Sequence, residues 1–188
     1  EALATMFIIK RIHNTLMTEV AEKLKERLSL SERIALYLPG YRGYKEKELR
    51  READRLVREY LLRKLQPAYR DFKSSMTSIA AAGDSSLMQL YNQVLSIFDR
   101  VVAKLRTASY GYSGFFDAVK VREPELDKLL EYDWNLIQAV DGLASTASSV
   151  AKAEPSKLPA ALAELRSKLL ELEDLLSKRE EVIRGVVG

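Results

Sequence analysis

The chain has 188 residues, of which 47% are apolar and 30% are charged, and its formal net charge is +3. A chain of this length can bury a core of its own, so we expect one domain over residues 1–188, with residues 1–5 as a flexible terminus or a tag remnant. The absence of cysteine excludes disulfides, thiolate zinc sites and thiol nucleophiles, and the single histidine, His13, excludes sites that need several imidazoles.

Helical spacing of apolar residues begins near the start of the chain. Residues 3–28 carry one apolar face and predict a first helix. A capping-box pattern from Ser29 to Glu32 then predicts a short helix, which Pro39-Gly40 ends. The loop that follows, PGYRGY, is rich in tyrosine and glycine.

A long and highly charged helix is predicted from Lys45 to about residue 80. Pro67 lies inside it, and a proline in a helix either bends the helix or ends it. One apolar face nevertheless keeps its phase on both sides of the proline, through Val57, Leu61, Leu65, Tyr69, Phe72, Met76 and Ile79. A chain that reversed at Pro67 would have no reason to keep this phase, so we expect a kinked but continuous helix.

Three further long helices are predicted in the rest of the chain. One follows the cap Asp84-Ser85, the next begins at Glu123-Pro124 with acids near the positive end of its dipole, and the last follows Ser156. The last helix carries leucines at alternating spacings of four and three, namely Leu158, Leu162, Leu165, Leu169, Leu172 and Leu176. We interpret this seam as a wall of the core, with self-association as the alternative.

No segment alternates apolar and polar residues as a strand does, so the predicted fold class is all-α. Four long helices with short connections predict an antiparallel helical bundle, to which an N-terminal helix and a short connecting helix are added. If the chain continues through Pro67, both tyrosine- and glycine-rich segments meet at one end of the bundle. We call this the Tyr/Gly end, and its candidate binding residues are Tyr41, Arg42, Tyr44, Lys45, Tyr110, Tyr112, Phe115 and Arg122.

The Tyr/Gly end is compatible with two kinds of binding and with a purely structural role. Tyrosine rings, basic side chains and helix N-termini suit a partner protein, and they also suit an anionic or phosphate-bearing ligand. The same residues can instead close a corner of the bundle. Neither GYRGY nor YGYSG matches a phosphate-binding loop. We expect a non-catalytic protein-interaction or scaffold module that binds a partner protein or itself, with the anionic ligand as the alternative.

The basic helix over residues 45–66 supports a third hypothesis, which is weak nucleic-acid binding without sequence preference. Residues 42–73 hold 11 basic and 6 acidic side chains, a local net charge of +5. The charges are interleaved along the helix, which favours a solvated face that pairs with itself.

Asp133 lies on the apolar face of its predicted helix. A carboxylate in such a position needs a partner, either as a structural hydrogen bond to a neighbouring arginine or tyrosine or as a general base or metal ligand with a raised pKa. We favour the structural bond, because no other residue completes a catalytic set. We therefore assign no catalytic residue, metal site or cofactor.

Two further expectations concern the source and the location of the protein. Asparagine and glutamine are scarce while lysine, arginine and glutamate abound, which favours a thermophilic source. The sequence shows no apolar run long enough for a membrane span and no cleavable leader, which favours the cytoplasm.

Overall fold

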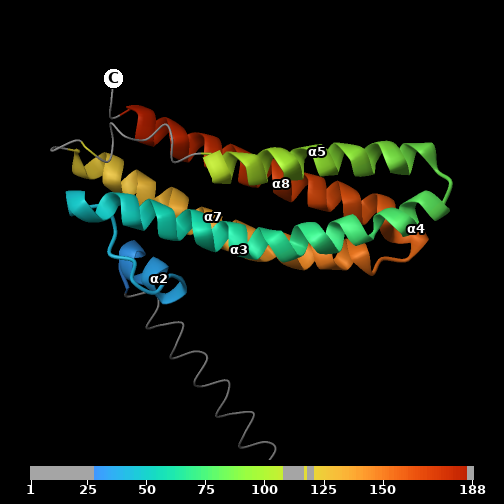
Figure 1. Cartoon of the computed structure of the whole chain (residues 1–188), viewed down its shortest axis with the longest axis horizontal. Helices are drawn as coiled ribbons and strands as arrows, with labels where there is room; N and C mark the ends of the chain where they lie inside the picture. Colours follow the sequence, from blue (N-terminus) through green and yellow to red (C-terminus); the bar gives the residue numbers. More distant parts are fainter. Residues whose placement is uncertain (1–27, 108–116, 118–120, 186–188) are drawn as a thin grey trace, which may run out of the picture.

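The computed structural model describes residues 28–107, 117 and 121–185. Its long helices are α3 (Arg50–Ser74), α5 (Ser85–Thr107), α7 (Glu123–Ala151) and α8 (Leu158–Gly185). The shorter elements are α2 (Leu30–Tyr37), α4 (Met76–Ala81) and the 3-10 turns η1 (Lys47–Leu49) and η3 (Pro155–Lys157). No strand occurs in the described ranges and the helices pack against one another, which confirms the predicted all-α bundle (Figure 1). The helix predicted over residues 3–28 lies outside the described residues.

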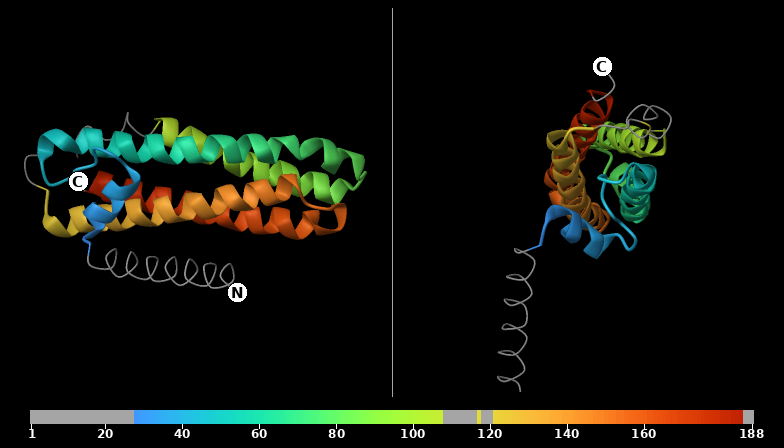
Figure 2. Two further views of the ribbon diagram at one scale, coloured as in Figure 1. Left: turned by 90° about the horizontal axis from the view of Figure 1, so that it is seen from below. Right: turned by 90° about the vertical axis from the view of Figure 1, so that its left-hand side faces the viewer.

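The four long helices alternate in direction along the chain, as an antiparallel bundle requires (Figure 1). Helix α7 packs extensively against both α3 and α8, whereas α5 packs against α8 and, less extensively, against α3. Helices α5 and α7 therefore occupy opposite corners of the bundle (Figure 2). As a consequence α3 and α7 are parallel neighbours, and so are α5 and α8.

Helix α3 runs through Pro67 without a break. Leu65 and Ala68, on either side of the proline, are buried on the same face as Phe72. The prediction that the chain does not reverse at Pro67 is therefore confirmed. The helix starts later than predicted, at Arg50, because a 3-10 turn occupies the residues immediately before it.

Two of the predicted helix caps are present, whereas Ser156, predicted to cap the last helix, lies inside the 3-10 turn η3 that precedes α8. The Ser29 hydroxyl accepts a hydrogen bond from the Glu32 amide, and the Glu32 carboxylate accepts one from the Ser29 amide at 2.8 Å. At the start of α5, the Asp84 carboxylate accepts bonds from the amides of Ser86 at 2.8 Å and Leu87 at 3.2 Å. These bonds satisfy amides that the first turn of each helix leaves unpaired.

The core lies along the axis of the bundle. All six leucines of the predicted seam on α8 are buried in it, which agrees with the interpretation of the seam as a wall of the core. Leu170 lies off the seam and is 38% exposed. None of the helices within the described ranges is long and apolar enough to cross a membrane.

Candidate functional site

At the Tyr/Gly end the structure describes the first tyrosine- and glycine-rich segment, whereas residues 108–116, which contain the second, lie outside the described residues, so the meeting of the two segments stays a prediction. Helices α3 and α7 begin there and α8 ends there, while α5 runs towards this end and stops short of it (Figure 1). Arg51 on the first turn of α3 donates a 2.9 Å hydrogen bond to Asp117, which lies between α5 and α7 in the chain. Gly40 and Gly43 adopt φ values of +88° and +77°, a region that favours glycine.

The candidate binding residues of this end divide into three groups. Tyr41 and Tyr44 are buried, with exposed fractions of 5% and 1%. The basic side chains Arg42, Lys45 and Arg122 are exposed, and Arg122 forms an ion pair with Glu125 at 2.9 Å. The others, Tyr110, Tyr112 and Phe115, lie outside the described residues. Binding of a partner at the Tyr/Gly end stays a prediction.

The two buried tyrosines bind charged side chains inside the bundle. We define the buried ionic cluster as Tyr41, Tyr44, Asp54, Asp133 and Arg179. Arg179 Nε donates to Asp133 Oδ1 at 2.6 Å, and Nη1 donates to Asp54 Oδ1 at 2.9 Å. The Tyr44 hydroxyl accepts from Arg179 Nη2 at 2.9 Å and donates to Asp133 Oδ2 at 2.7 Å. Tyr41 donates to the same oxygen at 3.4 Å.

Two further arginines flank the buried ionic cluster. Arg58 Nε donates to Asp54 Oδ2 at 2.8 Å, so both oxygens of this carboxylate are engaged. Arg50, which is itself buried, donates from Nε to the carbonyl oxygen of Tyr44 at 3.0 Å. The loop before α3 is thereby fixed to the bundle through both its main chain and its tyrosine side chains.

The surroundings shift the proton affinities of the cluster. Burial raises the pKa of Asp133, while the charge of Arg179 and the Tyr44 bond oppose that shift. Burial alone would lower the pKa of Arg179, but Asp133, Tyr44 and Asp54 hold it well above its usual range. Burial and the nearby Asp133 charge raise the pKa of Tyr44 well above its usual value. Asp133 accepts all of its hydrogen bonds in this cluster and donates none, which suits an ionised carboxylate beside a charged guanidinium.

The cluster joins α3, α7 and α8 to the loop that precedes α3. Its charged groups are paired with one another, and each hydrogen bond described above joins a donor to an acceptor. The prediction that Asp133 makes a structural hydrogen bond to a neighbouring arginine and tyrosine is confirmed. Such a network defines which helix faces meet, because a shifted helix would leave a buried charge without its partner.

Sequence reasoning missed Arg179 and Asp54, although a signal for both was present. Continuing the leucine seam of α8 with its four-and-three spacing leads from Leu176 to position 179. Likewise, Asp54 lies three residues before Val57 on the apolar face of α3. Charged residues at core positions near the same bundle end therefore indicated mutual partners.

The basic face of α3 is largely paired with acidic neighbours. Arg55 binds Glu52 and Glu59, both at 2.6 Å, and Lys64 binds Asp141 of α7 at 2.8 Å. These pairs agree with the interpretation of a solvated face. They reduce the positive charge that this helix could present to a nucleic acid.

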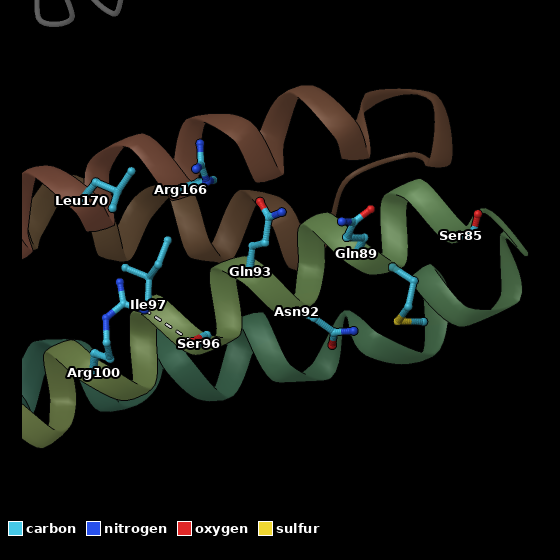
Figure 3. Close-up of a pocket in the computed structure, with 10 residues that line it drawn as sticks. Ser85, Gln89, Asn92, Gln93, Ser96, Ile97, Arg100, Arg166 and Leu170 are labelled. Carbon is cyan, nitrogen blue, oxygen red and sulfur yellow. Dashed lines mark hydrogen bonds between the residues drawn. The ribbon is translucent and has the colours of Figure 1, made fainter.

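A second candidate site lies on the surface between α5 and α8. We call it the α5/α8 groove, and its volume is about 740 Å³. Its lining consists of Ser85, Met88, Gln89, Asn92, Gln93, Ser96, Ile97, Arg100, Arg166 and Leu170. Figure 3 shows Gln89 and Gln93 projecting from α5 on the side of α8, where Arg166 and Leu170 form the opposite wall.

One end of the α5/α8 groove is bounded by contacts between the two helices. Arg100 binds Glu173 through two hydrogen bonds, at 2.8 and 2.9 Å. One turn further on, Lys104 donates to Ser177 at 2.7 Å. Arg166 is exposed and has no ion pair or hydrogen bond with the residues that the structure describes. Bonds between α5 and α8 therefore hold one end of the groove in place, and the groove carries one unpaired positive charge.

The groove was not predicted, although the sequence carried a compositional signal for it. The chain has only four glutamines and three asparagines, and three of these seven amides line this one groove. Exposed amides follow no apolar periodicity, so a search for helical faces passes over them.

Neither site contains an evident set of metal ligands or cofactor contacts. Among the described residues, no group of three histidine, cysteine or acidic side chains is arranged to hold a metal ion. No protein-family model matches the chain, no curated protein matches it, and no solved structure matches its fold. Its function must therefore be argued from its own geometry.

Proposed function

We propose that this protein is a non-catalytic interaction module that binds an extended segment of a partner protein in the α5/α8 groove. The observation that carries the proposal is the pair Gln89 and Gln93, which project one turn apart into a hollow faced by the unpaired Arg166 (Figure 3). The Tyr/Gly end stays the alternative surface, through its exposed basic side chains.

The spacing of the two glutamines matches the repeat of an extended chain. Residues four apart on a helix are separated by about 6 Å along its axis. Two residues of an extended peptide span about 6.6 Å, so Gln89 and Gln93 lie near alternate peptide units of such a segment. Each glutamine amide offers a donor and an acceptor, which is what one peptide unit requires. Backbone recognition of this kind depends little on the partner's sequence.

The charges of the groove favour an acidic residue in the partner segment. Arg100 is already engaged by Glu173, whereas Arg166 is available to a carboxylate. A charge-assisted bond to an arginine is stronger than a bond between neutral groups and adds directional preference. Leu170 and Met88 add apolar surface to the lining of the groove.

The chemistry of the lining supports binding without catalysis. The groove presents amides, hydroxyls, apolar side chains and two guanidiniums. A guanidinium stays protonated at neutral pH, and an amide neither gives nor takes a proton there. The hydroxyls of Ser85 and Ser96 have no general base in the lining to activate them.

The test is a selection from a random-peptide display library with the full chain as bait. We expect enriched peptides that contain an acidic residue and that bind the wild type. Their affinity should fall at least about tenfold in Gln89→Ala plus Gln93→Ala, because two charge-neutral hydrogen-bond pairs are lost. Arg166→Ala should weaken them by a similar factor.

A matched control removes two exposed amides elsewhere. Asn135→Ala plus Gln138→Ala changes the same chemistry on α7 and should leave peptide affinity unchanged. The proposal would be contradicted if the Gln89/Gln93 variant and the Asn135/Gln138 variant bound the peptides equally well, or if neither variant bound them. Either result would place recognition outside the groove.

A further inference from the structure

A smaller pocket lies between α3 and α5, on a different face from the groove described above. Its volume is about 340 Å³. Its walls include Arg70 from α3 and Arg106 from α5, with Gln66 beside them and Val102 and Ala103 as apolar surface. It forms between α3 and α5, which pack less extensively than the other neighbouring pairs of long helices.

The two arginines of this pocket form no ion pair with the described residues, and with Asp99 the lining has a formal net charge of +1. Neither Arg70 nor Arg106 forms an ion pair or hydrogen bond with the residues that the structure describes. The single carboxylate in the lining, Asp99, already accepts a 2.6 Å hydrogen bond from the Tyr69 hydroxyl.

We propose that this pocket binds a small phosphorylated molecule, with its phosphate group held between Arg70 and Arg106. Two guanidiniums offer up to ten N–H donors, and the amide of Gln66 adds two more. A phosphate ester has three terminal oxygens that accept such bonds, whereas a carboxylate has two. The volume lies at the lower end of the range for small-molecule sites, about 300 to 1,000 Å³, so the ligand is small.

This inference is independent of the peptide groove, because the two sites share no lining residue. The pocket also differs in place and composition from the Tyr/Gly end. Its phosphate contacts come from the C-terminal halves of α3 and α5, with Arg106 in the last turn of α5, and no helix N-terminus takes part.

The experiment is calorimetric titration of the full chain with inorganic phosphate and with glycerol 3-phosphate at constant ionic strength. Saturable binding is expected for both, and acetate and chloride should bind at least about tenfold more weakly. Arg70→Gln plus Arg106→Gln should weaken phosphate binding by about tenfold or more, since charge-assisted bonds are lost. Both arginines are exposed, so the fold should be retained, which circular dichroism checks.

Two further variants make the result decisive. Arg106→Lys keeps the charge and removes the forked donor, so it should also weaken phosphate binding. Arg63→Gln removes an exposed arginine of α3 that lines neither pocket and should leave phosphate binding unchanged. The proposal would be overturned if phosphate did not bind, if acetate bound as tightly, or if Arg63→Gln weakened phosphate binding as much as the double variant does.

Discussion

At the scale of single residues, the buried ionic cluster is the feature with the largest energetic consequence. Asp133 and Arg179 are nearly or fully buried, and each loses hydration that only its partners replace. A complete network of this kind contributes modestly to net stability, whereas an incomplete one is strongly unfavourable. The main effect of the cluster is therefore to define how α3, α7 and α8 pack against one another.

Asp133→Asn should destabilise the protein by about 3 kcal/mol, because Arg179 would lose one of its two buried counter-charges. Urea unfolding measures this change. Asp174→Asn, which removes an exposed partner of Lys178, is the matched control and should cost less than about 1 kcal/mol. Equal effects of the two variants would show that the buried pair has no special role.

Tyr69 provides a prediction about pH. Its hydrogen bond to Asp99, together with partial burial, raises its pKa to about 12 from 10.0. The folded state therefore favours the protonated phenol, so this stabilisation is complete below pH 10 and is lost as the pH rises towards 12. The wild type should exceed Tyr69→Phe in unfolding free energy by about 1 kcal/mol below pH 10, and the difference should shrink between pH 10 and 12. A difference that stays constant across that range would contradict this account.

At this scale the sequence shows that a buried charge needs a hydrogen-bonding partner, but it does not show which residue provides it. Asp133 on an apolar face predicts that a partner exists, and the structure supplies Arg179 and Tyr44. Arg179 is 46 residues away along the chain, so only the packing of α7 on α8 brings the two together. Tyr44 was predicted to be a surface ligand contact because tyrosine in a glycine-rich loop suits exposure and burial alike.

At the scale of elements, the continuity of α3 through Pro67 has the widest effect. It sets the direction of every later helix and so brings the starts of α3 and α7 to one end. The apolar phase across the proline was sufficient to predict this. The start of α3 was not predictable, because exposed lysine and glutamate residues fit a helix and a 3-10 turn equally well.

Pro67→Ala should stabilise the protein by about 1 to 2 kcal/mol. Proline removes a helical hydrogen bond and crowds the preceding turn, and it is exposed here, so alanine would restore the bond without disturbing the core. The gain is smaller than the full helix-interior penalty because alanine also frees the unfolded chain. Gln66→Ala, at the neighbouring exposed position, is the control and should change stability by less than about 0.5 kcal/mol. A clear loss in Pro67→Ala would mean that the packing of α3 requires the proline.

At the scale of the whole molecule, the diagonal placement of α5 and α7 determines where ligands could bind. It makes α5 and α8 parallel neighbours, and their contacts at Glu173 and Ser177 fix the wall of the α5/α8 groove. The sequence predicted four helices and their directions but not which corners they occupy. The order of the helices around the bundle axis depends on complementary side-chain shapes, which the spacing of apolar residues does not encode.

The central claim, that Gln89 and Gln93 hold an extended peptide, can be tested directly by NMR of side-chain amide groups. Only seven asparagine and glutamine side chains occur in the chain, so their signals can be assigned by single substitutions. On titration with a display-selected acidic peptide, the account predicts that the NH₂ signals of Gln89 and Gln93 shift while those of Asn135 and Gln138 stay in place. Saturable binding that leaves the signals of Gln89 and Gln93 unmoved would contradict it.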